Sequence, residues 1–356
     1  MGNSESTASV SADSDSQALS LSIIMPVYNG VDFISRSLPP LIAMLERGEI
    51  LEIIVVDDSS TDNTAAMASD MGARVVPSGG RLGPGGARNH VSSLARGNIL
   101  WFVDADVVLH DDAAQKLLSG FVDESVVAVF GSYDDKPPAK NFFSQYKNLV
   151  HHYYHHLASE EAQTFWSGCG AVRQEAFQAV GGFDVLRYKY PSIEDIEMGH
   201  RLIKAGGRIL LRKNVLSTHL KVWRLGNLLH TEIFRRAIPW SRLIVNDGAL
   251  SDDLNVGMTE QVRAVVAGIF VLALLAALVG WISPAVLLAT VLVTVFANLE
   301  IALFFLHRKG PLFAVAALMY HQIYYLYSGA AFAWVVVERA FSKLFAGKST
   351  ASAETK

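Results

Sequence analysis

The chain has 356 residues, which is enough for one large domain and a further unit. Its formal net charge of −4 gives no reason to expect a nucleic acid as partner. Its one cysteine, Cys169, excludes an internal disulfide and fits a reducing compartment. Hydrophobic residues make up 51% of the chain and their excess lies toward the C-terminus, so the composition favours a protein with membrane segments.

The first twenty residues are rich in Ser, Ala and Asp, and they predict a disordered tail because they lack the basic start and apolar core of a secretory signal. Three apolar runs follow, at Leu21–Tyr28, Leu51–Val56 and Ile99–Val103, and each ends in a polar loop. Helical patterns at Phe33–Leu45 and Thr64–Met71 alternate with these runs. The alternation predicts an α/β fold with a parallel sheet, in which the polar loops collect at one edge.

Two carboxylates, Asp104 and Asp106, follow the third apolar run with one small residue between them. In an extended strand their side chains point to the same side, where both can reach one divalent cation. Oxygen ligands of this kind suit Mg²⁺ or Mn²⁺, and such a metal indicates a phosphate-bearing substrate. The alternative at this point is an ordinary surface turn after a buried strand.

The second apolar run ends at Asp57 and Asp58, where a carboxylate can accept a hydrogen bond from a base or a ribose. The alternative for Asp58 is a helix N-cap. Farther along, the glycine-rich segment Gly79–Gly86 opens onto a helix expected over Ala87–Ala95. Glycines let a phosphate approach the backbone and a helix N-terminus favours anions, whereas the alternative is a mobile surface loop.

Residues 221–245 alternate apolar and basic groups at helical spacing, which is typical of helices in a membrane interface; the alternative is a solvated basic face. Three candidate membrane spans follow, at Ala264–Ile282, Ala285–Phe305 and Leu312–Val337, with a buried helical hairpin as the alternative. Basic residues cluster before, between and after these spans. The positive-inside rule places all three clusters in the cytoplasm, which three full spans do not allow, so two or three spans stay open.

Six short motifs occur in order over about residues 20–225. They are Pro26–Asn29, Val55–Asp62, Gly85–Asn89, Asp104–Asp106, Gly181–Asp184 and Glu194–Asp195. Together they resemble the inverting glycosyltransferases of family 2. The resemblance implies a GT-A fold, which is a Rossmann-like α/β fold with a mixed, mostly parallel sheet and helices on both faces, here followed by C-terminal transmembrane helices.

The resemblance also implies which residues bind the donor and the metal. The residues expected to bind the nucleotide sugar are Pro26, Tyr28, Asp58, Arg88 and Asp104. Tyr28 is expected near the base and Arg88 on the diphosphate. Asp106 is expected to bind Mn²⁺ or Mg²⁺ directly, with Asp104 and His219 as further ligands, although a lone histidine is more often structural.

On the acceptor side the resemblance implies a general base and a wall of small residues. Asp195 is the expected base, with Glu194 in reserve, and the alternative for both is a favourable interaction with the helix dipole. The residues expected to contact the acceptor are Trp166, Gly168, Cys169 and Gly170. The Gln-x-x-Arg-Trp motif of the processive polymerases of the family has no match at 221–224, so a single transfer is expected.

These features divide the chain into five parts. They are a disordered tail (1–20), a GT-A domain (21–220), basic amphipathic interface helices (221–258), two or three transmembrane helices (259–340) and a flexible tail (341–356). We expect an integral membrane protein whose catalytic domain faces the cytoplasm, at the inner or plasma membrane in a bacterium. Its expected reaction moves one sugar from a nucleotide-diphosphate sugar, with UDP chosen from its frequency in the family, to a hydroxyl of a lipid-linked or membrane-delivered acceptor.

Two alternatives remain at this point. A polyprenyl phosphate can be the acceptor, in which case no base is needed because a phosphate is already an anion. A nonenzymatic membrane protein that senses a nucleotide is the alternative from another class. The sequence leaves the sugar, the base, the acceptor and the oligomeric state open.

Overall fold

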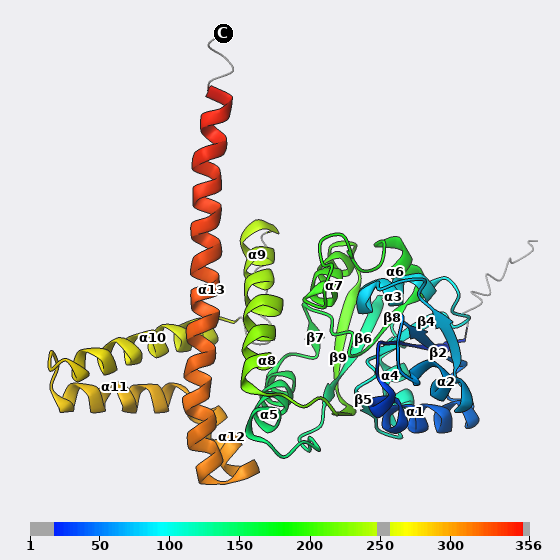
Figure 1. Ribbon diagram of the computed structural model, residues 1–356, viewed down its shortest axis with the longest axis horizontal. Helices are drawn as coiled ribbons and strands as arrows, with labels where there is room; N and C mark the ends of the chain where they lie inside the picture. Colours follow the sequence, from blue (N-terminus) through cyan, green and yellow to red (C-terminus); the bar gives the residue numbers. More distant parts are fainter. Residues whose placement is uncertain (1–17, 248–256, 352–356) are drawn as a thin grey trace, which may run out of the picture.

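The structure is a computed structural model that describes residues 18–247 and 257–351. Most of the tail predicted at 1–20 and the end of the tail predicted at 341–356 therefore lie outside the described residues. The described residues from 341 to 351 continue the last helix of the chain. We call residues 18–220 the α/β unit, and residues 221–247 with 257–351 the helical unit (Figure 1).

The α/β unit alternates strands and helices as the sequence predicts. Its elements are β1 (Leu21–Val27), α1 (Val31–Glu46), β2 (Glu52–Asp57), α2 (Thr64–Asp70), β3 (Arg74–Pro77), α3 (Gly83–Ser92), β4 (Ile99–Val103), β5 (Val107–Leu109), α4 (Ala113–Leu118), η1 (Ser119–Phe121), β6 (Val126–Tyr133), α5 (Phe142–Leu157), β7 (Glu161–Ala162), β8 (Cys169–Arg173), α6 (Gln174–Ala179), α7 (Glu194–Lys204) and β9 (Arg208–His219). The helical unit consists of α8 (Leu225–His230), the π-helix η2 (Thr231–Ala237), α9 (Ile238–Asp247), α10 (Met258–Leu278), α11 (Pro284–Ala297), α12 (Leu299–Lys309) and α13 (Pro311–Ala351).

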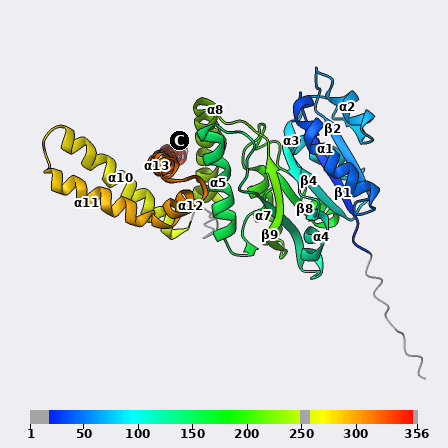
Figure 2. The ribbon, with the colours of Figure 1, turned by 90° about the horizontal axis from the view of Figure 1, so that it is seen from below.

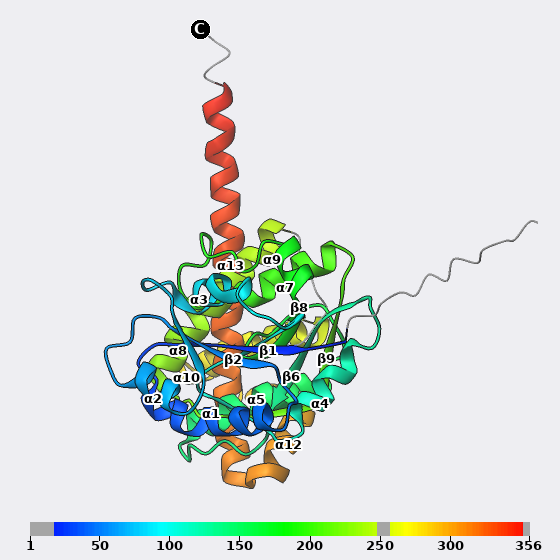
Figure 3. The ribbon, with the colours of Figure 1, turned by 90° about the vertical axis from the view of Figure 1, so that its right-hand side faces the viewer.

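One mixed sheet forms the centre of the α/β unit. Within the described residues its nine strands follow the order β3-β2-β1-β4-β8-β6-β9-β5, and β7 pairs with β9. Strands β1, β2, β3, β4, β6 and β9 share one direction, whereas β5, β7 and β8 run against it. Helices α3 and α7 cover one face, and α1, α2 and α4 cover the other (Figure 3). The predicted mixed, mostly parallel sheet with helices on both faces is therefore confirmed.

Two apolar cores lie on the two faces of this sheet. Ile23 and Met25 of β1 belong to the core under α1, and Ile24 belongs to the core under α3 and α7. In β4, Trp101 belongs to the core under α1 and Phe102 belongs to the core under α3 and α7. Central strands that are covered on both faces need continuous apolar runs, which explains why these runs are readable in the sequence.

A third apolar core joins the two units. Tyr146 and Leu149 of α5 pack against Ile301 and Phe305 of α12 and against Tyr320 of α13. Seen from below, α13 is viewed along its axis and lies between the α10–α11 hairpin and the α/β unit (Figure 2). The first half of α13 is therefore part of the folded protein core.

The apolar C-terminal segments differ from three simple spans. Among the described residues, α10 is the one helix that is long and apolar enough to cross a membrane. Helices α11 and α12 pass the same test only as a pair, and this pair is bent by 72°. The uninterrupted helix expected over Ala285–Phe305 is thus broken at Asn298, which is fully buried. The expected third span lies in α13, which is long enough to cross a membrane but is not apolar enough.

Two phenylalanines of the helical unit test the third core. Phe305 on α12 is fully buried, whereas Phe296 on α11 is 78% exposed. We expect Phe305→Ala to lower the free energy of unfolding by about 3–5 kcal/mol, because it deletes a buried ring and leaves a cavity. Phe296→Ala is the matched control and should change it by less than about 0.5 kcal/mol. Denaturant unfolding in mild detergent measures both, and equal losses would contradict the packing described.

Candidate active site

A cleft of about 380 Å³ opens beside the ends of β1 and β2. Its lining includes Pro26, Tyr28 and Asp58, which the sequence predicts as donor-binding residues. It also includes Lys189 and Tyr190, which come from the loop before α7 and carry no motif of their own. The structure thus brings the predicted residues of two strand ends together and adds a loop more than one hundred residues away.

The carboxylate of Asp58 is buried and fully hydrogen-bonded by the glycine-rich segment. It accepts from the backbone N–H groups of Leu82 (2.8 Å) and Gly83 (2.9 Å) and from the hydroxyl of Ser78 (2.9 Å). Gly83 has φ +73°, a conformation that favours glycine. The amides predicted to hold a phosphate therefore bind Asp58, which fixes the loop on the cleft wall. Arg81 from this loop lies 3.3 Å from the centre of the Tyr28 ring.

Asp104 and Asp106 lie in a tight turn between β4 and β5, where the sequence suggests an extended strand. The N–H of Val107 donates to the carbonyl of Asp104 at 3.0 Å and closes this turn. Strand β4 lies inside the sheet and β5 lies at its edge, so the chain must change position between the two carboxylates. The surface-turn alternative is thus right about the backbone, but the turn faces the other acidic residues of the site.

Arg88 does not have the surface expected of a diphosphate ligand. Its side chain is 2% exposed and pairs with the carboxylate of Asp104 at 2.5 Å. The guanidinium also lies 5.7 Å from the centre of the Phe102 ring and 5.5 Å from that of Phe183. The prediction that Arg88 contacts the donor is corrected accordingly. Arg88 binds Asp104 from the protein interior, where it neutralises the charge of that carboxylate.

Strand pairing brings Asp106 and His219 together. Val107 of β5 lies opposite His219 of β9, and the N–H of Leu220 donates to the carbonyl of Asp106 at 2.8 Å. The His219 Nε2 is 3.5 Å from Asp106 Oδ2, and the imidazole stacks on Tyr133 at 4.4 Å between ring centres. Burial would raise the pKa of Asp106, but the proximity of His219 outweighs it and the pKa lies below its usual value.

The metal-ligand set expected from the sequence is only partly assembled. Within residues 18–247 and 257–351, no three His, Cys, Asp or Glu side chains form a ready group for a metal ion. Asp106 and His219 are adjacent and of suitable chemistry, whereas Asp104 is engaged by Arg88. The donors present therefore fit a divalent cation that takes its remaining ligands from a substrate.

Asp195 and Glu194, at the start of α7, have different environments. Asp195 is partly exposed and accepts from the N–H (3.0 Å) and the hydroxyl (3.1 Å) of Ser167. Glu194 is buried and accepts from the N–H of Ser192 at 2.7 Å. Burial, together with the negative charge of Asp195, raises the pKa of Glu194 to about 7. Of the two carboxyls, Asp195 is the one with access to a ligand.

The predicted acceptor wall is only partly at the surface. Trp166 is partly exposed and contacts Tyr133 edge-on at 4.8 Å. Gly168 is buried because the Trp166 indole covers it, so that a Cβ there would lie 2.6 Å from the ring. Cys169 and Gly170 are buried within β8. The expectation for these last two does not fit the structure, since they lie in β8 between β4 and β6 and have no exposed surface for an acceptor.

The pKa of Asp104 is affected by the other acidic residues of the site. Burial and the negative charges of Asp106 and Asp195 raise its pKa, and Arg88 opposes this effect. Arg236 of η2 lies on the same side, and its pKa is raised despite burial because Glu232 and Asp195 are negative. The N–H of Asp104 donates to the carbonyl of Gly168 at 3.2 Å, and the adjacent Ser167 donates to Asp195, so two distant acidic loops approach each other. Helix η2 borders them, because the hydroxyl of Ser192 donates to its Arg235 carbonyl at 2.7 Å.

Comparison with known proteins agrees with this geometry. Residues 22–181 match the family model of Glycosyl transferase family 2. This range contains β1 from its second residue on, the glycine-rich segment and the Asp104–Asp106 turn. This part of the chain, a little under half of its length, is therefore similar to the family 2 glycosyltransferases.

Relatives of known name match in part. Poly(ribitol-phosphate) beta-glucosyltransferase of Bacillus spizizenii is 36% identical over 104 residues, which are 27% of this chain and 16% of that protein. Glycosyltransferase GlyG of Streptococcus pneumoniae is 25% identical over 258 residues, which are 68% of this chain and 83% of that protein. The matches to the first three curated relatives span between 16% and 35% of their length.

A solved structure resembles nearly the whole chain. It is the mannosyltransferase PcManGT from Pyrobaculum calidifontis, in complex with GDP-Man and Mn²⁺, with a TM-score of 0.58 and 19% identity. The similarity covers 90% of this chain and 88% of that one. It shows that the two chains share their fold, including the helices that follow the α/β unit.

The buried Glu194 predicts a pH dependence of stability. Its pKa of about 7 in the folded protein lies above the unfolded value of 4.5, so the folded protein binds this proton more tightly. Its contribution is complete below pH 4.5 and is lost as the pH rises toward 7, on the order of 3 kcal/mol. Unfolding midpoints measured from pH 4 to 8 should show this loss in the wild type and not in Glu194→Gln.

The exposed Glu175 supplies the matched control. Glu175→Gln makes the same carboxyl-to-amide change on the surface and should keep the wild-type profile. If Glu194→Gln and Glu175→Gln gave parallel curves, the buried carboxyl would not titrate as described.

Proposed function

We propose that this protein is a membrane-attached, metal-dependent, inverting glycosyltransferase. It transfers a single sugar from a nucleotide-diphosphate sugar to a hydroxyl group of a lipid-linked or membrane-delivered acceptor. The observation that carries the proposal is the approach of two acidic loops: the N–H of Asp104 donates to the carbonyl of Gly168 at 3.2 Å, and the adjacent Ser167 donates to Asp195 at 3.0 Å. Helix α3 connects these loops to the cleft, since its Gly83 lines the cleft and its Arg88 binds Asp104. Such a concentration of negative charge is costly unless it serves cations and protons of a reaction.

The donor side of the proposal rests on the cleft at β1 and β2. A base can lie against the exposed Tyr28 ring if Arg81 moves from its face, and Pro26 and Asp58 close the sides of the cleft. Lys189 of the facing loop supplies a positive charge at the same cleft. The solved neighbour was crystallised with GDP-Man and Mn²⁺, and we carry both classes of ligand to this chain as proposals. UDP remains our expectation for the nucleotide.

Asp106 and His219 would hold the divalent cation, Mn²⁺ or Mg²⁺, with Asp104 beside them. When bound, the cation supplies positive charge to the diphosphate that leaves. The pKa of Asp106, held below its usual value beside His219, keeps this carboxylate ionised and ready for a cation. Arg88 fixes the orientation of Asp104 from below, which limits how far the turn can move.

Asp195 would act as the general base on the acceptor. The acceptor oxygen attacks the anomeric carbon, the bond from that carbon to the diphosphate oxygen breaks, and the hydroxyl proton passes to Asp195. The two hydrogen bonds from Ser167 fix the direction of the carboxylate. In-line attack from the side opposite to the leaving group inverts the configuration at the anomeric carbon.

A second acceptor class is favoured by one observation. Lys147 of α5 and Arg236 of η2 share the single carboxylate of Glu232, at 2.9 Å and 3.6 Å. The pair leaves one net positive charge in the neighbourhood of Asp195, where it would suit an anionic acceptor such as a polyprenyl phosphate. A receptor that only senses a nucleotide has no use for Asp195 or for these cations.

Metal dependence is tested through His219. Chelation is expected to stop release of the nucleoside diphosphate, and Mn²⁺ is expected to restore it. His219→Ala should raise the Mn²⁺ concentration needed for half-maximal release by at least about tenfold, since even outer-shell partners have effects of that size. His90→Ala, at an exposed position on α3, is the control. Unchanged metal dependence in His219→Ala would remove His219 from the proposed ligand set.

Asp195→Asn separates the two acceptor classes. For a hydroxyl acceptor we expect transfer to fall by about 10²–10⁴-fold with donor binding retained, because the base is lost and the shape is kept. For a phosphate acceptor most transfer should survive. Asp70→Asn, at an exposed position on α2, is the matched control. Turnover of UDP- and GDP-sugars by the purified protein measures both, and no turnover of any nucleotide sugar by the wild type would contradict the enzyme proposal.

A further inference from the structure

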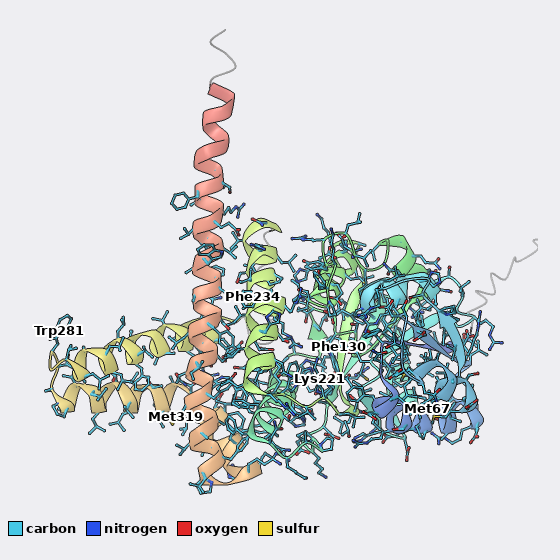
Figure 4. All side chains as sticks on the ribbon, in the orientation of Figure 1. Met67, Phe130, Lys221, Phe234, Trp281 and Met319 are labelled. Atoms are coloured by element: carbon cyan, nitrogen blue, oxygen red, sulfur yellow. The ribbon has the colours of Figure 1, made fainter. Side chains whose placement is uncertain are left out.

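The long helix α13 presents one continuous apolar face to the outside. One set of its exposed apolar residues recurs every three or four positions, with one step of seven across residues 326 and 327, which are half-buried. The set is Leu312, Val315, Met319, Ile323, Ala330, Trp334, Val337 and Phe341, and Phe332 and Val336 are exposed beside it. Met319 lies on the side of α13 that is turned away from the α/β unit (Figure 4). No Asp, Glu, Lys or Arg occurs between residues 311 and 337.

The opposite face of α13 is attached to the rest of the protein along most of its length. Ala317 and Tyr320 pack into the third core beside α5. Farther along, α13 contacts η2 and α9, and Val335 is buried. Arg242 of α9 donates two hydrogen bonds to Glu338, at 3.1 Å and 3.0 Å. A helix that crossed the bilayer would lose contact with α5, η2 and α9 after its first turns. Helix α13 instead keeps such contacts as far as Glu338.

The α10–α11 hairpin leaves this assembly in a different direction. It runs across the direction of α13 and projects on the side away from the α/β unit (Figures 1 and 2). No charged residue occurs between 264 and 299, and Trp281 at its tip is 83% exposed. Helix α11 has 14 residues, which gives a length of about 21 Å, a large part of the roughly 30 Å hydrocarbon core.

A buried polar cluster marks the base of the hairpin. Glu260 accepts hydrogen bonds from Tyr154 of α5 and Tyr325 of α13, both at 2.7 Å, and from Arg263 at 2.5 Å. Arg263 also donates to the carbonyl of Ala297 at 2.8 Å, which places the end of α11 level with the start of α10. These bonds fix the direction of the hairpin relative to α5 and α13.

We infer that α13 lies flat in the membrane interface and that, within the described residues, the α10–α11 hairpin is the part that enters the hydrocarbon core. This rests on the proposed membrane attachment. The partner of the apolar face is then the acyl boundary of a lipid bilayer, since the face is continuous with the exposed apolar surface of the hairpin.

The inferred placement agrees with the distribution of basic residues. Arg308, at the end of α12, pairs with Asp135 of the α/β unit. Arg339 and Lys343 lie near the end of the apolar face of α13, on either side of Phe341. In the inferred placement, the basic residues of 221–242, those of 308–309 and these two meet the anionic headgroups of one leaflet, which the positive-inside rule requires and three full spans do not allow.

The placement also sets the height of the candidate site. Helix η2 contacts α13, and its Arg235 carbonyl accepts a hydrogen bond at 2.7 Å from the hydroxyl of Ser192, three residues before Asp195. A reactive group of a lipid-linked acceptor would thus meet Asp195 at a fixed distance from the bilayer surface. In this way α13 acts as a platform that aligns the cleft with the headgroup layer.

Spin labels along α13 test the inference. The native Cys169 is buried, so a single added cysteine can be labelled in the full chain. We would label Val315→Cys, Ile323→Cys, Ala330→Cys and Val337→Cys in phosphatidylcholine–phosphatidylglycerol vesicles and measure depth from collisions with oxygen and a water-soluble nickel chelate. Ser35→Cys on α1 is the aqueous control, and Leu288→Cys on α11 is the deep control.

A flat α13 predicts one shallow depth at all four positions. A spanning helix predicts depths that differ widely, because residues 315 and 337 are about 33 Å apart along the axis. A graded profile would overturn the inference and leave the membrane attachment intact. Spin–spin broadening with low access to oxygen would overturn it in favour of a second copy of the chain. Failure of the protein to bind vesicles would instead contradict the proposed attachment.

Discussion

The repulsion between the carboxylates gathered around the candidate site is the constraint on which this structure depends. The fold compensates each of them separately. Asp58 is held by backbone amides, Asp104 by the buried Arg88, Asp106 by His219 and Asp195 by Ser167. Gly83 and Arg88 belong to α3, His219 belongs to β9, and Ser167 lies just before β8. The sheet must therefore be assembled before these charges can be tolerated together.

Much of the α/β unit could be predicted from the sequence because its signals are local. The buried runs of β1, β2 and β4 are continuous, and the acidic start of α7 follows a turn, so their ends could be placed on one edge of the sheet. Asp58, Asp106 and Asp195 were predicted as site residues in this way. The family resemblance gave them roles that the spacing alone does not specify.

The predictions failed where contacts between residues on different elements decide whether a side chain is buried. Cys169 and Gly170 are in the sheet interior because β8 inserts antiparallel between β4 and β6, and no local pattern announces that pairing. Arg88 was expected on the diphosphate, but its side chain packs against Phe102 and Phe183, which lie on other elements, 14 and 95 residues farther along the chain. Hydropathy likewise does not reveal the bend between α11 and α12.

The helical unit connects the site to its surroundings through a few specific contacts. Helix α5 carries Lys147 toward the acceptor side and packs its other residues against α12 and α13. Helix η2 places Arg236 near Asp195 and contacts α13. A movement of the helical unit relative to the α/β unit would therefore displace η2 and alter the surroundings of Asp195, with no movement of the sheet.

The central claim is that Asp106 and His219 share a divalent cation with the diphosphate of the donor, with Asp195 facing the sugar. An experimental structure of the full chain with Mn²⁺ and UDP tests it most directly. The account predicts density for the metal between Asp106, His219 and the diphosphate, with the base in the cleft beside Tyr28. A nucleotide bound elsewhere, or a metal with neither Asp106 nor His219 among its ligands, would contradict it.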